Sequence, residues 1–204
     1  MARRAAGGTG RAGRGGARLS SSDPERKRLL ELLTQLAYEK RQVVLASGKS
    51  SDFYIDTKQA SLSAEGHYLV GRLVLAAVRD LVPDAQAVGG MTMGADPIAS
   101  AASLTSWLQD APLPAFYVRK EPKGHGTSAW VEGRKGFPQG AKVCLVEDVV
   151  TTGGSTLKAI DRCRMEGLRV AGVVALVDRE EGGRQNVEAA GVPLRALFTR
   201  SEFP

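Results

Sequence analysis

Short apolar runs alternate along this chain with longer segments whose apolar residues recur at helical spacing. Asp23 followed by Pro24 is a typical helix start, and the leucines of residues 29–36 then follow at helical spacing. Ser63 can cap a second helix in the same way, with an apolar face over 69–77. Further helices are expected over 97–108 and 156–165, and strands over 53–55, 87–90, 115–118, 143–146, 170–177 and 194–198.

These predicted strands have no polar face, so both of their faces should be covered. Such strands, alternating with helices, indicate an α/β fold with a central, mostly parallel sheet flanked by helices. A length of 204 residues suits one domain, which we expect over 23–204. Ligands bind such sheets beyond the carboxyl ends of the strands. The loops expected at that edge are 89–96, 119–136, 147–155 and 178–183.

The net charge of +6 is concentrated at the start of the chain. Residues 1–22 contain five arginines and no acid, so the remainder is nearly neutral. Their Gly, Ala, Ser and Arg content predicts a disordered basic tail. A plain extension, a weak polyanion binder and a mis-assigned start codon are the alternatives for this tail. Because the remainder offers no broad basic face, we expect no nucleic-acid partner.

The sequence also bears on location. No segment approaches the roughly 18 consecutive apolar residues of a membrane span, and the start of the chain lacks the apolar run of a secretory signal. Cys144 and Cys163 have no CxxC spacing, which favours reduced thiols over a disulfide or a metal site. We therefore expect a cytoplasmic protein with no membrane partner.

Residues 143–156 combine an apolar strand, an acid pair and a glycine-rich turn that opens a helix. Glu147 and Asp148 at the end of a buried strand would be costly unless they bound something, and carboxylates accept hydrogen bonds from sugar hydroxyls. Backbone N–H groups at such a turn bind anions with the help of the helix dipole. The combination predicts a site for a phosphorylated ribose.

This stretch resembles the phosphoribosyl pyrophosphate (PRPP) motif of the type I phosphoribosyltransferases, in which two acids and two apolar residues precede Thr-x-Gly-Gly-Ser/Thr. The resemblance implies the type I phosphoribosyltransferase fold, with a small N-terminal hood over about 23–62. The PRPP-binding residues that it implies here are Glu147, Asp148, Val149, Val150, Thr151, Thr152, Gly153, Gly154 and Ser155. Enzymes for hypoxanthine, adenine, uracil and orotate share the motif, so it does not name the base.

Two further segments resemble those that contact the base in orotate phosphoribosyltransferases. Residues 47–56 resemble the Ser-Gly-x-x-Ser-x-x-Tyr segment of the hood, which implies that Lys49 and either Phe53 or Tyr54 lie near orotate. Residues 178–183 resemble the Asp-Arg-x-Glu-x-Gly motif, in which the arginine meets the base. An arginine can hold a carboxylate through two parallel hydrogen bonds, and orotate carries one. The orotate-binding residues implied are Lys49, Phe53, Tyr54, Thr151 and Arg179.

A basic segment over 119–126 resembles the Arg-Lys-x-x-Lys-x-His loop of the same family. The resemblance implies that the loop closes over PRPP partly from a neighbouring subunit, and hence a homodimer. The PRPP-binding residues that it adds are Arg119, Lys120, Lys123 and His125. The catalytic roles that the resemblance implies fall on Lys120, Lys123, His125 and Asp148.

The implied activity is the transfer of phosphoribosyl from PRPP to orotate, with Mg²⁺ as cofactor held by substrate and water rather than by a protein metal site. One departure concerns residues 89–96, which lack the Tyr-Lys that many relatives carry there. Two other functions stay open: a phosphoribosyltransferase for another base, and a PRPP-binding regulator that uses the arginine tail on nucleic acid.

Overall fold

The computed structural model describes residues 23–44, 50–122 and 129–204. The predicted tail 1–22 and three predicted site residues, Lys49, Lys123 and His125, lie outside these ranges. The helices are α1 Pro24–Leu36, α2 Lys58–Ser61, α3 Ala64–Leu81, α4 Ala95–Leu108, α5 Gly154–Met165 and α6 Gly183–Ala189. The strands are β1 Tyr38–Val44, β2 Ser50–Ile55, β3 Ala87–Met91, β4 Ala115–Val118, β5 Val131–Glu132, β6 Lys142–Val150, β7 Arg169–Asp178 and β8 Leu194–Thr199, followed by a 3₁₀ turn Arg200–Glu202.

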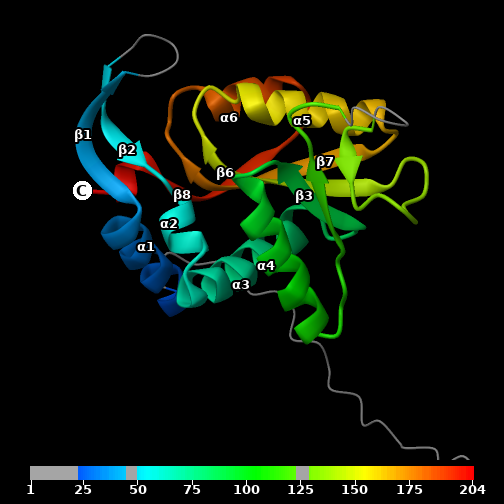
Figure 1. The fold of residues 1–204 in the computed structure, drawn as a ribbon, viewed down its shortest axis with the longest axis horizontal. Coiled ribbons are helices and arrows are strands. Elements are labelled where there is room, and N and C mark those ends of the chain that lie inside the picture. The colour runs from blue at the N-terminus through cyan, green and yellow to red at the C-terminus, as the bar shows by residue number, and fades with distance from the viewer. Residues whose placement is uncertain (1–22, 45–49, 123–128) are drawn as a thin grey trace, which may run out of the picture.

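The central sheet has six strands in the order β5-β4-β3-β6-β7-β8. All neighbouring pairs are parallel except β4 with β5, which is antiparallel at the edge. Figure 1 shows α5 and α6 on one face of the sheet and α3 and α4 on the other. The predicted α/β class and mostly parallel sheet are thus confirmed.

Alternation along β6 divides the core into two layers. Cys144 and Val146 pack into the layer under α1, α3 and α4, whereas Val143 and Leu145 pack into the layer under α5 and α6. All four side chains are buried because each face of the sheet carries helices. This burial explains why the strand sequence has no polar face.

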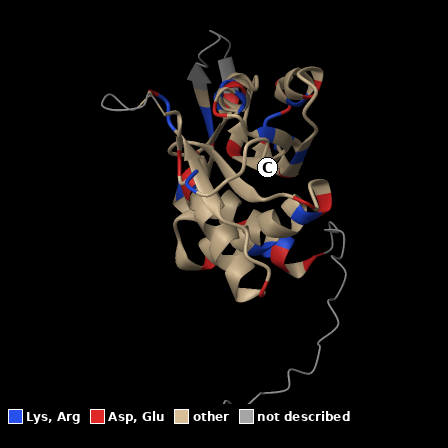
Figure 2. Ribbon diagram, turned by 90° about the vertical axis from the view of Figure 1, so that its right-hand side faces the viewer, with Lys and Arg blue, Asp and Glu red and all other residues tan. Residues whose placement is uncertain are grey.

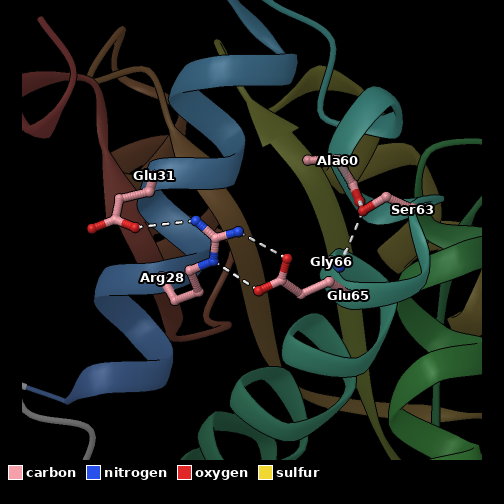
Figure 3. Close-up of polar contacts among 6 residues, drawn as sticks. All are labelled: Arg28, Glu31, Ala60, Ser63, Glu65 and Gly66. Atoms are coloured by element: carbon pink, nitrogen blue, oxygen red, sulfur yellow. Dashed lines mark hydrogen bonds and ion pairs between the residues drawn. The ribbon is translucent and has the colours of Figure 1, made fainter.

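The N-terminal segment forms a separate layer beside the sheet, in which β1 and β2 pair antiparallel. It is joined to α3 by Arg28, whose Nε and Nη2 donate to the two carboxylate oxygens of Glu65 at 2.7 and 2.9 Å (Figure 3). Ser63 caps α3 by accepting from the Gly66 N–H at 3.1 Å. The start of α1 is capped as predicted, since the Asp23 side chain accepts from the Glu25 N–H.

The predicted strands and helices are all present, with different ends. The largest difference is β6, which was predicted to end at residue 146 but continues to Val150 because residues 147–150 pair with residues 175–178 of β7. The acid pair therefore lies within a strand rather than after it. β1, β5, α2 and α6 have no counterpart among the elements predicted from the sequence.

In Figure 2, Lys and Arg positions and Asp and Glu positions are both scattered over the ribbon in view, neither sign forming a continuous band. This mixture fits the near-neutral balance expected for the chain beyond residue 22. Among the described residues, no helix is both long and apolar enough to cross a membrane.

Candidate functional site

Glu147 is a buried acid whose side chain is held by the helix that follows it. Its side chain is 5% exposed, and Oε2 accepts hydrogen bonds from the hydroxyls of Ser155 at 3.0 Å and Thr156 at 2.9 Å. Burial raises the pKa of Glu147 to about 8, and the charge of Asp148 acts in the same direction. The hydroxyl donors oppose this shift only in part. Without a ligand, Glu147 therefore has one carboxyl oxygen hydrogen-bonded to α5 and favours its protonated, neutral form.

Asp148 is half-buried and lies against the loop between β3 and α4. A Cβ at Gly94 would come within 2.3 Å of the Asp148 Cγ, so only glycine allows this approach. Lys58, at the start of α2, forms an ion pair of 2.5 Å with Asp56. This pair raises the pKa of Lys58, with a smaller contribution from Asp148. Elements from the hood, β3 and β6 therefore meet around this carboxylate.

The predicted phosphate loop lies between β6 and α5. Gly153 caps α5 in the left-handed region, at φ 80°, which favours glycine. The loop rests on the start of α6: a Cβ at Gly183 would lie 2.4 Å from the Thr151 carbonyl oxygen, and the Asn186 amide donates to the Thr152 carbonyl at 2.9 Å. With its carbonyls held on that side, the loop can present N–H groups and the α5 N-terminus to an anion.

Arg179 reaches the site from the neighbouring strand. Its backbone N–H donates to the Val150 carbonyl at 2.9 Å, which places it directly beside the start of the phosphate loop. Its side chain is buried, donates to the Phe53 carbonyl at 3.1 Å and pairs with Glu181 at 2.9 Å. The structure thus brings the predicted base-binding arginine to the hood and to the phosphate loop at once.

The two predicted hood aromatics differ in environment. Phe53 is 3% exposed and packs against Tyr38 and Phe203, with ring centroids 5.1 and 5.5 Å apart. Tyr54 is half-buried, with the Arg41 guanidinium 3.8 Å from its ring centroid. Tyr54 is therefore the aromatic of this pair that is more open to a ligand.

Of the predicted basic segment, Arg119 and Lys120 are described. The Arg119 side chain pairs with Glu132 at 3.0 Å, and Lys120 is exposed. The Arg119 backbone N–H donates to the Trp130 carbonyl at 2.8 Å. The chain that enters the basic segment at Arg119 and the chain that leaves it at Trp130 therefore lie side by side, and we call this pair the two limbs at the base of the segment.

Several residues at this site belong to none of the sequence patterns described above. Gly94 lies against Asp148, the charge of Asp148 contributes to the raised pKa of Lys58, and Gly183 supports the phosphate loop. Arg162 of α5 contacts the base of the basic segment. A helical arginine and single glycines are common, so only their spatial neighbours mark them. Within the described part of the chain, no three His, Cys, Asp or Glu side chains gather to hold a metal ion.

Comparison with known proteins agrees with this geometry. The family model of the phosphoribosyl transferase domain matches residues 87–190. The chain is 54% identical over 179 residues to an orotate phosphoribosyltransferase of Sorangium cellulosum, covering 88% of this chain and 93% of that protein. It is 50% identical over 159 residues to that of Aquifex aeolicus, covering 78% and 85%.

Solved structures give the same answer. The orotate phosphoribosyltransferase of Mycobacterium tuberculosis in complex with PRPP has a TM-score of 0.70 and 34% identity, covering 88% of this chain and 98% of that one. The Aeropyrum pernix enzyme has a TM-score of 0.72 and 33% identity, covering 85% and 94%. The chain, with its acid pair, phosphate loop and buried arginine, belongs to the orotate phosphoribosyltransferase family.

Proposed function

We propose that this site transfers the phosphoribosyl group of PRPP to orotate, giving orotidine 5′-monophosphate and pyrophosphate, a step of pyrimidine (UMP) biosynthesis. The observation that carries the proposal is the continuity of β6 with the phosphate loop, next to Arg179, the residue that follows β7. One edge of the sheet then offers donors for a phosphate, acceptors for a ribose and a cation for the orotate carboxylate. Membership of the family supports the same reaction.

In this mechanism the chain positions the substrates and stabilises charge. The bond from ribose C1 to the pyrophosphate oxygen breaks and its electron pair leaves with pyrophosphate. A ring nitrogen of orotate forms the new bond to C1 and gives up its N–H proton to solvent. Residues 151–155 hold the 5′-phosphate, and the carboxylates of Glu147 and Asp148 accept from the ribose hydroxyls. Negative charge beside the ring stabilises the oxocarbenium-like state between the two bonds.

The basic segment completes the site around the leaving group. Lys120 is the described cation at its base, and Lys123 and His125 are assigned by resemblance alone. Cations that meet the pyrophosphate as its charge develops lower the barrier, because they interact more strongly with the transition state than with bound PRPP.

We further propose that Mg²⁺ is needed. Magnesium binds phosphate oxygens and one or two carboxylates while keeping several waters, and the adjacent carboxylates of Glu147 and Asp148 fit that donor set through water. When bound, the ion would neutralise the pyrophosphate charge. The chain's own contribution is to orient PRPP against the acid pair.

The test is pyrophosphate release with PRPP and each of orotate, uracil, hypoxanthine and adenine, with and without Mg²⁺. We expect release with orotate and Mg²⁺ only. Release with another base at a comparable kcat/KM would replace the substrate assignment. PRPP binding without turnover on any base would instead indicate a regulator.

We also propose a homodimer that pairs through the outer face of α4. Leu104 lies about one helical turn before Trp107 and Leu108 at the end of this helix, and the three are 58%, 69% and 73% exposed. Apolar side chains gathered in this way mark an interaction surface. Sedimentation of Trp107→Glu should show monomers, whereas Met165→Glu, at an equally exposed residue of α5 on the opposite face, should leave a dimer. A monomeric wild type, or a dimeric Trp107→Glu variant, would contradict the interface.

A cytoplasmic location is kept as part of the proposal. It is supported by the two cysteines, Cys144 and Cys163, which are free and buried rather than paired, as is usual in a reducing compartment. Localisation of a fluorescent fusion would test it.

A further inference from the structure

Arg162 lies on the helix that begins at the phosphate loop, yet its side chain contacts the base of the basic segment. It is two turns beyond Gly154 on α5, about 12 Å along the helix axis. Its Nη1 donates to the Arg119 carbonyl at 2.8 Å and its Nη2 to the Lys120 carbonyl at 2.9 Å. One guanidinium thus holds two successive peptide units of the segment.

The same guanidinium also contacts Trp130, which follows the basic segment along the chain. Its Cζ lies 4.3 Å from the ring centroid of Trp130, and the Trp130 carbonyl accepts from the Arg119 N–H. One turn further, Glu166, the residue that ends α5 as its C-cap, accepts from the Trp130 N–H at 2.7 Å. Both limbs are therefore fixed to α5 through hydrogen bonds, and through a cation–π contact that adds stabilisation.

We propose that Arg162 is a positioning residue for Lys120: it couples the helix that binds the 5′-phosphate to the base of the basic segment, so that the lysine is held at a set distance from bound PRPP. A planar guanidinium suits this role because its donors lie in a fixed fork, which lysine cannot reproduce. The proposal rests on the role of Lys120 given above, and it assigns Arg162 no contact with substrate.

The test compares Arg162→Met and Arg162→Lys with Arg164→Met. Methionine keeps much of the length of the arginine side chain but has no hydrogen-bond donors. Lysine keeps the positive charge but donates from a single nitrogen. Arg164 is a matched control on the same helix, since it is 49% exposed and contacts Asp161 and the Ala190 carbonyl. Loss of about 1 Å of positioning costs on the order of 100-fold in rate. We expect kcat to fall by about 10- to 100-fold for Arg162→Met and by less for Arg162→Lys. The control should stay within about twofold.

A double-mutant cycle with Lys120→Ala separates positioning from simple stabilisation of the fold. If Arg162 acts through Lys120, Arg162→Met should lower kcat far less in the Lys120→Ala background than in the wild type. The inference would be overturned if Arg162→Met lowered kcat by the same factor in the Lys120→Ala background as in the wild type. It would also be overturned if kcat were unchanged in both Arg162 variants. Should Arg162→Met fail to fold, Arg162→Lys in the same cycle gives the answer.

A silent Lys120→Ala would refute the proposed role of Lys120, and the inference with it. A damaging Lys120→Ala with silent Arg162 variants would refute the inference alone.

Discussion

Replacing Gly94 by alanine tests whether Asp148 acts from the position it occupies here. A Cβ at residue 94 would lie 2.3 Å from the Asp148 Cγ and 2.4 Å from each carboxylate oxygen. Ordinary contact begins near 3.4 Å, so the carboxylate must move by about 1 Å. A misplacement of that size costs on the order of 100-fold in rate, equivalent to roughly 2.7 kcal/mol of barrier. We therefore expect kcat/KM to fall by about two orders of magnitude.

The same substitution should leave the fold intact. Gly94 has φ −62° and ψ −38°, which alanine adopts without strain. Alanine also favours helix over glycine, by up to about 1 kcal/mol in a helix interior and less at an end. Because Asp148 is only half-buried, its side chain can rotate away instead of distorting the strand. Activity should therefore fall while the melting temperature stays unchanged or rises slightly.

The assay is pyrophosphate release at varied PRPP, with thermal unfolding of each variant and a double-mutant cycle with Asp148→Ala. If the clash with the carboxylate is the cause, Gly94→Ala should have little further effect once that carboxylate is absent. An activity of Gly94→Ala within about threefold of wild type would refute the placement of Asp148. An equal loss in both backgrounds would refute the clash as the cause.

Three further predictions follow from burial and charge. Burial raises the pKa of Glu147 to about 8 in the free protein, and ribose hydroxyls favour its ionised form. PRPP binding, measured by calorimetry, should therefore release a proton and become tighter as the pH rises towards 8. If the Glu147→Gln variant shows the same dependence of PRPP affinity on pH as the wild type, this reasoning is wrong. Arg179→Lys should raise the KM for orotate by about 10- to 100-fold, the loss of one charge-assisted hydrogen bond, and affect that for PRPP much less; Arg184→Lys, at a more exposed ion pair with Asp178, is the control. Cys144 and Cys163 are fully buried and burial raises the pKa of each to about 12, so a thiol reagent should label neither until the protein is unfolded, and rapid labelling of the native protein would refute their burial.

Local patterns in the sequence were sufficient for the class of fold and the centre of the site. The apolar runs over 143–146 and 170–177 have no polar face, and that property alone indicates strands covered on both sides. The caps at Asp23 and Ser63 likewise depend on residues two or three positions away. These features were predictable because the interactions behind them are local or depend only on burial.

The tertiary structure decided the rest, because those features join residues that are distant along the chain. β1 is a polar segment whose strand conformation comes from pairing with β2, so its own pattern carries no signal. The acids of β6 became part of a strand only through pairing with β7, and the Glu147 pKa follows from the burial that results. Gly94 against Asp148, and Arg162 against Lys120, are contacts across 54 and 42 positions that packing alone sets. The sequence by itself determined which chemical groups this protein carries on one edge of a sheet, and packing determined which of them touch.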